Sequence, residues 1–410
     1  PDVSELEGLS DHQRTTLGGA LTSPVAMLNG KPGTGKTYAT AKLAKRLVAL
    51  NGMSEVGACA PTGKAARRVQ ENLAANGVAI DAKTIHSMFG LNVNLDEDDD
   101  GGDETQTQSG DTTGGGLPVL SPTHIPRFVI VDEVSMLDVS VAARLLQRLP
   151  TGTHVLLVGD VNQLPPVGHG SPLRDILRSK VVPAGELTEI RRNSGMIVTA
   201  CHQIAAGEEF DTADKYDPST GANLRVLDMP NEAETVAMVV RTMGLLPSYG
   251  FDPVNDCQVL AALNVKGACS KAKINELLQD ALNPSAPKVD GKRFRLRDKV
   301  IFTKNTELAS VSRGQTGQSV PPATGAVASS RDYTSPDSYH NDGSKTRVAN
   351  GDIGRVIAID DKCTIVRFDA PERVVRLTKD VEMFLDLAYV VSCHKFQGSE
   401  SPVVVVVLDP

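Results

Sequence analysis

Residues 30–37 have the sequence Gly30-Lys31-Pro32-Gly33-Thr34-Gly35-Lys36-Thr37, which matches the pattern GxxxxGK[ST] of a phosphate-binding loop. An apolar run precedes it at 25–28, and a helical pattern follows from about residue 35. Glycines let backbone N–H groups turn toward phosphate oxygens, and the helix N-terminus adds a favourable dipole. The stretch therefore predicts a strand, a phosphate-binding loop and a helix within an open α/β sheet.

The side chains of this loop predict a site for ATP and Mg²⁺. Lys36 is expected to reach the β- and γ-phosphates, and the Thr37 hydroxyl is expected to ligate the metal. The expected nucleotide-binding residues of the loop are Gly30, Pro32, Gly33, Thr34, Gly35, Lys36 and Thr37.

A second acidic site is predicted where an apolar strand at 128–131 ends in Asp132-Glu133. Carboxyl ends of parallel strands meet at one edge of a sheet, where ligands bind. We expect Asp132 to hold Mg²⁺ and Glu133 to orient and deprotonate the attacking water. Two adjacent acids also begin many surface loops, so this prediction depends on the phosphate-binding loop.

A third strand at 155–158 leads into the run Gly159–Gly168, which contains Gln163 and two consecutive prolines. An amide at a strand end can hydrogen-bond the γ-phosphate and respond to its loss, and prolines stiffen the loop that carries it. The alternative is an ordinary turn, which Gly-Asp and Pro-Pro also favour.

Other apolar patterns complete the expected sheet and its helices. A further strand is predicted at 56–60, and the helix after the loop is expected to place Leu43, Leu47 and Leu50 on one face and to end near Asn51-Gly52. The valine-rich run at 403–408 suits the middle of a parallel sheet. Alternating patterns between 347 and 368 suggest a small barrel.

Composition excludes several classes of protein. A chain of 410 residues suggests two or three domains, and no apolar run approaches the roughly 20 residues that span a bilayer. The amino terminus does not resemble a secretion signal, so a cytoplasmic location is expected. Six cysteines without a CxxC pair disfavour a zinc site and a disulfide framework.

The net charge of −8 does not exclude nucleic-acid binding. Seven acidic residues lie between 96 and 104, so the rest of the chain is close to neutral and could still carry a basic groove. Residues 91–123 and 310–345 have too few apolar residues to form a core and are predicted to be flexible insertions.

Several motifs together resemble superfamily-one helicases of the RecD and Dda type. Besides the loop and the Gly159–Gly168 run, they are Ala60-Pro61-Thr62-Gly63-Lys64-Ala65-Ala66, Thr84-Ile85-His86, Asp132-Glu133-Val134-Ser135-Met136 and Ser392-Cys393-His394-Lys395-Phe396-Gln397-Gly398-Ser399-Glu400. Their order and spacing also agree with this family. The resemblance covers nearly the whole chain and is more specific than any single motif.

This resemblance implies two RecA-like P-loop domains with parallel sheets, with ATP between them and a small β-barrel inserted in the second. The expected boundaries are 1–185 for the first domain, 186–290 for the first part of the second, 291–380 for the barrel and 381–410 for the return segment. It also implies a monomeric motor that hydrolyses ATP and moves 5′ to 3′ on single-stranded DNA in repair, recombination or replication.

The family's positions give roles to further residues. Gln13 matches the residue that recognises adenine through its amide, and Glu400 matches one that contacts the ribose. Arg192 resembles the arginine that reaches the γ-phosphate, where a cation offsets developing charge. Arg191 stands where many relatives have an aromatic residue, and the sequence leaves open which of the two arginines acts.

The resemblance also implies contacts with nucleic acid. The positions that match strand-contacting residues are Pro61, Thr62, His86, His394 and Lys395. Hydroxyls, backbone amides and cations suit phosphates. The stretch 288–304, with seven basic residues and Phe294, suits a strand-binding surface or simply a solvated face of a sheet. DNA is the family's usual partner, and the sequence does not distinguish it from RNA.

Relatives carry one more motif, with a second arginine, after the position of Pro410. We therefore expect this segment alone to retain Mg·ATP binding and to hydrolyse ATP weakly.

Three functions can be compared with these patterns. A translocating helicase is the leading hypothesis, and a module that binds nucleic acid in an ATP-dependent manner without unwinding is the alternative. A small-molecule kinase has no use for the 392–400 motif.

Overall fold

The computed structural model describes residues 6–91, 124–189, 195–262, 266–286, 289–313, 336–369 and 371–408. The chain divides into two compact units, Pro1–Val226 and Leu227–Pro410, and each is described here by itself. Apart from Leu91, the predicted acidic insertion at 91–123 lies outside the described residues.

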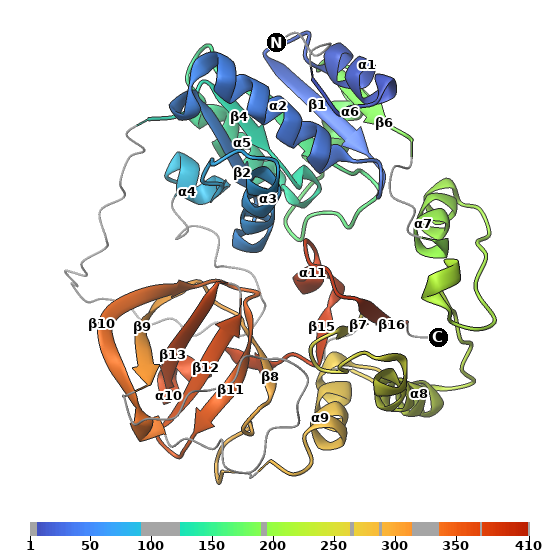
Figure 1. Cartoon of the computed structure of the whole chain (residues 1–410), viewed down its shortest axis with the longest axis vertical. Coiled ribbons are helices and arrows are strands. Elements are labelled where there is room, and N and C mark those ends of the chain that lie inside the picture. Colours follow the sequence, from blue (N-terminus) through green and yellow to red (C-terminus); the bar gives the residue numbers. More distant parts are fainter. Residues whose placement is uncertain are drawn as a thin grey trace, which may run out of the picture. The chain divides into compact units, whose positions relative to one another are not determined.

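The first unit is built on a six-stranded sheet in which every described pairing is parallel. Its strand order is β3-β2-β4-β5-β1-β6, and Figure 1 labels β1, β2, β4 and β6 of this sheet. The strands are β1 (Val25–Gly30), β2 (Val56–Ala60), β3 (Lys83–Thr84), β4 (Phe128–Val131), β5 (His154–Gly159) and β6 (Ala184–Leu187). The four strands predicted in this region are β1, β2, β4 and β5, and these predictions are confirmed.

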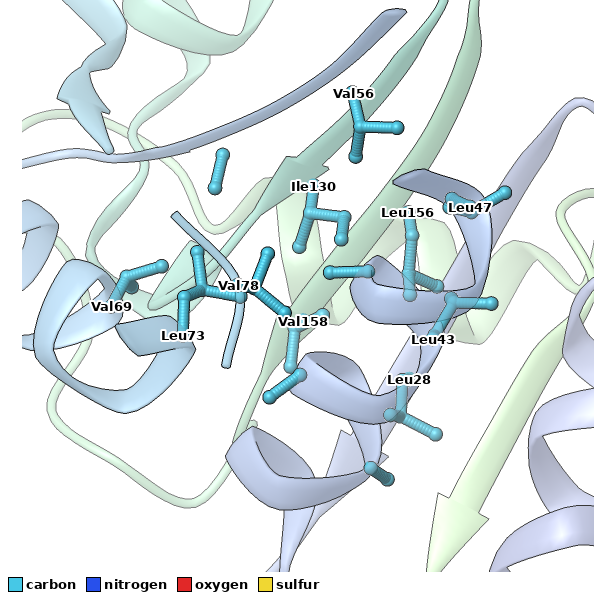
Figure 2. Close-up of a cluster of buried hydrophobic side chains, with 14 of the residues drawn as sticks. Leu28, Leu43, Leu47, Val56, Val69, Leu73, Val78, Ile130, Leu156 and Val158 are labelled. Carbon is cyan, nitrogen blue, oxygen red and sulfur yellow. The ribbon is translucent and has the colours of Figure 1, made fainter. Parts of the chain in front are cut away.

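Helices cover both faces of this sheet, because successive strand residues point to opposite sides. On one face Leu28, Ile130 and Val158 pack with side chains of α2 and α3, and Figure 2 shows this layer. On the other face Met27 and Val129 pack with side chains of α4, α5 and α6. The α-helices described in this unit are α1 (Asp11–Ala20), α2 (Lys36–Asn51), α3 (Gly63–Ala75), α4 (Ile85–Phe89), α5 (Val139–Arg148), α6 (Pro172–Ser179) and α7 (Met196–Ala206).

Helix α2 fixes the orientation of the phosphate-binding loop. It ends at Asn51, with Gly52 as its C-cap, as predicted. Leu43 and Leu47 are buried, whereas Leu50, which helical spacing puts on the same face, is 53% exposed. The spacing of apolar residues identifies a stripe along a helix, but it does not show how far along the helix that stripe is covered.

The second unit contains two sheets. A three-stranded parallel sheet has the order β15-β7-β16, and a seven-stranded antiparallel sheet has the order β10-β9-β13-β12-β11-β8-β14. The first is made of β7 (Cys257–Ala261), β15 (Val390–Ser392) and β16 (Val403–Val407). The second is made of β8 (Lys299–Phe302), β9 (Thr306–Arg313), β10 (Tyr339–Val348), β11 (Ile353–Ile359), β12 (Cys363–Asp369), β13 (Glu372–Thr378) and β14 (Leu385–Leu387).

Four described helices belong to the second unit. They are α8 (Glu232–Leu245), α9 (Lys271–Leu282), α10 (Lys379–Glu382) and α11 (Cys393–Phe396). Apolar residues of α8, α9 and both sheets form one core. Strand β7 precedes the antiparallel sheet in sequence, while β15 and β16 follow it, so the parallel sheet is assembled from segments on both sides of the antiparallel one (Figure 1).

Two expectations for this unit differ from the structure or lie partly outside it. The prediction that the valine run occupies the middle of a sheet is wrong within the described residues, because β16 lies at the edge and β7 in the centre. Val404 and Val406 are 42% and 53% exposed. Of the stretch 310–345, the ends belong to β9 and β10, and residues 314–335 lie outside the described residues.

Candidate functional site

The predicted nucleotide-binding segments meet at one edge of the first unit's sheet. Strand β5 lies between β1 and β4, so the carboxyl ends of these three strands are neighbours. The phosphate-binding loop follows β1, Asp132 follows β4 and Asp160 follows β5. The edge is the one at which open α/β sheets bind ligands.

The backbone of the phosphate-binding loop requires its glycines. Gly33 and Gly35 have φ angles of 79° and 82°, a region that side chains with a Cβ rarely adopt. At Gly30, an added Cβ would come within 2.8 Å of the Thr34 hydroxyl and 3.1 Å of Leu187. The Thr34 hydroxyl donates to the Lys31 carbonyl at 2.8 Å, which closes the turn.

Lys36 lies inside this loop and faces three carboxylates. Its ammonium donates to the backbone carbonyls of Gly30 and Lys31, the latter at 3.2 Å. Burial lowers the pKa of Lys36, while the charges of Asp160, Glu133 and Asp132 oppose that shift. The structure therefore brings Lys36 and both predicted acids into one electrostatic site.

Asp132 and Glu133 occupy an environment that disfavours two negative charges. Burial raises the pKa of Asp132, although a hydrogen bond of 2.8 Å from the Glu133 N–H opposes that shift. Burial and the neighbouring Asp132 raise the pKa of Glu133 to about 7, while Lys36 and Arg68 oppose the rise. A carboxyl group with a pKa near neutrality suits a general base.

The backbone of Glu133 is also unusual. Its φ and ψ angles are 54° and 39°, the left-handed region. A non-glycine residue there costs about 1–2 kcal/mol, and such strain often accompanies function. The two acids follow β4 directly, and Glu133 is the N-cap of the short 3-10 helix Val134–Met136.

Gln163 contacts the loop after β4. The Ser135 hydroxyl donates to the Gln163 amide oxygen at 3.3 Å. This bond connects the segment that follows the paired acids with the segment that follows β5. The sequence identified Gln163, and it placed Ser135 in the motif Asp132-Glu133-Val134-Ser135-Met136 without assigning it a role.

Asp160 is the site residue to which sequence reasoning assigned no role. It is 1% exposed, and its Oδ1 accepts the Asn162 N–H at 2.9 Å. Its Oδ2 has no hydrogen-bond partner among the described residues. Among the neighbouring charges, Asp160 has the largest effect on the pKa of Lys36. Its position after a buried strand, parallel to that of Asp132, was the signal that could have found it.

The donors at this edge fit a hard divalent cation such as Mg²⁺, which prefers carboxylate and hydroxyl oxygens. Asp132 is a buried carboxylate whose pKa is raised by burial, and Asp160 supplies an unpartnered carboxylate oxygen nearby. Thr37 is the second residue of α2, at the end of the loop. Buried negative charge without a full set of partners is the environment that a cation stabilises.

Gln13 packs against the phosphate-binding loop. It is 2% exposed and its amide nitrogen donates to the Thr34 carbonyl at 3.2 Å. Its amide oxygen accepts the Ser10 N–H at 3.2 Å, and the Ser10 hydroxyl accepts the Gln13 N–H, which together form a capping box at the start of α1. The structure thus places Gln13 beside the loop, while its recognition of adenine stays a prediction.

The predicted strand-contacting residues of the first unit lie at the same edge of the sheet but at other strands. Pro61 and Thr62 follow β2, and His86 lies in α4, which follows β3. The Thr62 hydroxyl oxygen accepts the Ala65 N–H at 3.2 Å and caps α3. Since β2 and β3 lie beyond β4 in the sheet, these residues are displaced from the phosphate-binding loop along one edge.

The corresponding residues of the second unit lie around the short helix α11. Ser392 caps this helix by accepting the Lys395 N–H at 3.4 Å. His394 is exposed and Lys395 is half-buried. Burial and the charge of Lys271 lower the pKa of Lys395, while Asp386 opposes that shift. Glu400 is exposed in the segment between α11 and β16.

The structure contradicts only the stacking part of the strand-binding surface predicted for 288–304, and the exposed basic residues Arg293, Arg297 and Lys304 leave both a charged binding surface and a solvated face as predictions. Phe294 is 2% exposed and cannot stack on a base. Arg295 is buried against Asp280, and Lys299 donates to the Cys257 carbonyl at 3.1 Å. Of the basic residues described in this stretch, Arg293 keeps 60% of its side chain exposed.

Arg191 and Arg192 lie outside the described residues, because residues 190–194 are not among them. The assignment of the arginine that acts on the γ-phosphate therefore stays a prediction. Among the described residues, no helix has the length and apolarity needed to cross a membrane.

Comparison with known proteins shows the family. A family model described as an AAA domain matches residues 8–221, more than half of the chain. The ATP-dependent RecD2 DNA helicase of Deinococcus radiodurans is 30% identical over 399 residues, which is 96% of this chain and 44% of that protein. The chain belongs to the RecD/Dda type of superfamily-one helicases. The family predicted from the motifs is thereby confirmed.

Two further relatives of this helicase family match about two fifths of the chain. The RecBCD enzyme subunit RecD of Mycolicibacterium smegmatis is 33% identical over 194 residues, 43% of this chain and 32% of that protein. The ATP-dependent DNA helicase dda of Enterobacteria phage T4 is 28% identical over 184 residues, 44% of this chain and 38% of that protein. The chain thus spans less than half the length of each of these relatives.

Proposed function

We propose that the chain is the motor of a DNA helicase that couples ATP hydrolysis to 5′-to-3′ movement along single-stranded DNA. The observation that carries this proposal is the convergence of Lys36, Asp132, Glu133 and Asp160 at the carboxyl ends of three adjacent strands. The similarity to helicases whose names specify DNA and ATP supports the choice of both ligands.

Different residues of the first unit would have different roles in ATP hydrolysis. Backbone N–H groups of Gly33–Lys36 and the Lys36 ammonium would hold the phosphates, and Gln13 would hold the loop beside the base. Glu133 would accept the proton of the attacking water, a role that its near-neutral pKa suits. Gln163 would respond to the γ-phosphate and pass that change to the loop after β4 through Ser135.

Asp132 and Thr37 would hold Mg²⁺, which neutralises charge on the phosphates during transfer. We propose that Arg192 acts on the γ-phosphate and that Glu400 contacts the ribose. Pro61, Thr62 and His86 would hold the strand on the first RecA-like domain, and His394 and Lys395 on the second. Closing and reopening these two domains, with the small barrel inserted in the second, would shift the grip along the strand.

The test is ATP hydrolysis measured with and without single-stranded DNA, followed by strand displacement on duplexes with either a 5′ or a 3′ tail. We expect weak hydrolysis from this segment alone, with some stimulation by DNA, and we expect any duplex that is unwound to be the 5′-tailed one. Lys36→Ala should reduce hydrolysis by at least about 100-fold, because a cation on the transferring phosphate is lost. Lys45→Ala, an exposed lysine on the same helix, is the matched control and should hydrolyse ATP normally.

The outcomes separate the proposed functions. Stimulated hydrolysis without displacement of either tailed duplex would support an ATP-dependent binding or regulatory module. Normal hydrolysis by the Lys36→Ala variant would contradict the assignment of the phosphate-binding loop. Unwinding of the 3′-tailed duplex alone would contradict the proposed 5′-to-3′ polarity but would still support a helicase motor.

A further inference from the structure

The second unit contains a cluster of cations that the family motifs do not identify. Lys271 and Arg293 both contact the carboxylate of Asp386, Lys271 at 3.0 Å. Lys271 is the first residue of α9, Arg293 precedes β8, and Asp386 lies in β14. These three elements are distant in sequence, so tertiary structure alone assembles the cluster.

Lys395, a predicted strand-contacting residue, belongs to the same electrostatic cluster. Lys271 and Asp386 are the two charged side chains that act on its pKa, and Lys271 acts more strongly. Helices α9 and α11, which carry Lys271 and Lys395, both pack against β15. The cluster is therefore adjacent to the segment that the family uses to contact nucleic acid.

The charges of this cluster do not balance. Three cations share one carboxylate, so the group carries an excess of positive charge. The side chains of Lys271 and Asp386 are 18% and 22% exposed, and that of Arg293 is 60% exposed. Partly buried cations are screened less by salt than fully exposed ones, and the N-terminus of α9 adds a dipole that favours anions.

We propose that Lys271, Arg293 and Lys395 form a subsite for a phosphodiester of the bound single strand, held in place by Asp386. Asp386 fixes the positions of Lys271 and Arg293 before binding, which reduces the conformational entropy lost when a phosphate is contacted. This inference rests on the proposed function, because it assigns a new contact to the proposed strand-binding surface. Lys273, on the same helix as Lys271, is not part of this subsite, since it is exposed and pairs with Glu276 at 3.2 Å.

The experiment measures the affinity of the full chain for oligothymidylate over a range of NaCl concentrations. Each phosphate contact contributes a slope of about −0.7 to the dependence of log K on log salt for a single strand. The variant K271A/R293A should bind about tenfold more weakly and should lose about 0.7 from the slope for each contact removed. Lys273→Ala, which also removes one positive charge from α9, should keep the wild-type slope and stay within about twofold of wild-type affinity.

A melting curve of each variant separates lost binding from lost folding. If K271A/R293A does not fold, Arg293→Ala alone replaces it, because that side chain is mostly exposed. A folded variant with wild-type affinity and slope would overturn the proposal, as would an equal loss in Lys273→Ala, which would mean that net charge alone matters. Binding of inorganic phosphate at the cluster without any change in strand binding would assign it to free phosphate and also overturn it.

The wild-type arm tests the proposed function separately. A wild-type chain that does not bind the oligonucleotide at any salt concentration would contradict strand binding as a whole. A wild-type chain that binds, while K271A/R293A binds equally well, would contradict only the subsite.

Discussion

The two carboxyl groups that follow β4 differ in what their surroundings permit. Burial raises the pKa of Asp132, while a hydrogen bond from the backbone and the charge of Lys36 oppose that rise. Glu133 feels the charge of Asp132 as well as burial, and its pKa is raised to about 7. Under the proposed function, Asp132 would serve as the metal ligand and Glu133 as the base.

The raised pKa of Glu133 predicts a pH dependence of hydrolysis. Below pH 7 its carboxyl group is protonated and cannot accept a proton from water, so kcat/KM for ATP should rise with pH through about 7 and then level off. Glu133→Gln should reduce kcat by about 100- to 10,000-fold and remove this rising limb. A pH profile of steady-state hydrolysis measures both effects, and a rising limb that persists in the variant would contradict the assignment.

The same shift predicts how Glu133 affects stability. Its folded-state pKa lies above the ordinary value of 4.5, so the folded chain binds the proton more tightly than the unfolded chain. Its stabilising contribution is therefore complete below about pH 4.5 and is lost as the pH rises through 7. Under the proposed function, hydrolysis would need the ionised form of Glu133, which is the form that favours folding least.

At the scale of secondary structure, the central and edge strands of the second unit's parallel sheet differ in how far their valines are buried. Val259 in β7 is completely buried, whereas Val406 in β16 is 53% exposed. Val259→Thr should lower the free energy of unfolding by about 1–3 kcal/mol, because a hydroxyl enters an apolar core. Val406→Thr is the matched control and should change it by less than about 0.5 kcal/mol. Urea titration measures the difference, and equal costs would contradict the edge position of β16.

At the scale of the whole molecule, the described groups that contact the phosphate-binding loop belong to the first unit. Gln13, Asp132, Glu133 and Asp160 all precede Val226, where that unit ends. A fragment of residues 1–226 should therefore bind Mg·ATP within about tenfold of the full chain's affinity, because among the proposed nucleotide contacts it lacks Glu400. A tenfold change in affinity corresponds to about 1.4 kcal/mol. Titration calorimetry measures this, and a folded fragment without binding would contradict it.

Much of the fold could be predicted because its signals are local. The strands at 56–60 and 128–131 have the bounds that their apolar runs indicated, and α2 ends where Asn51-Gly52 predicted. The loop at 30–37 could be recognised from sequence alone, because its backbone requires glycines at angles that few other residues adopt. Periodicity and turn residues carry such information within a few positions of the chain.

The sequence by itself determined the phosphate-binding loop, the paired acids and the family, because these depend on short segments in a fixed order. Tertiary structure alone decided that Asp160 faces Lys36, that Leu50 and Val406 are exposed, and that Arg293 meets Lys271 on Asp386. Burial and electrostatic environment arise from contacts between segments far apart in the chain, and no local pattern specifies which segments those will be.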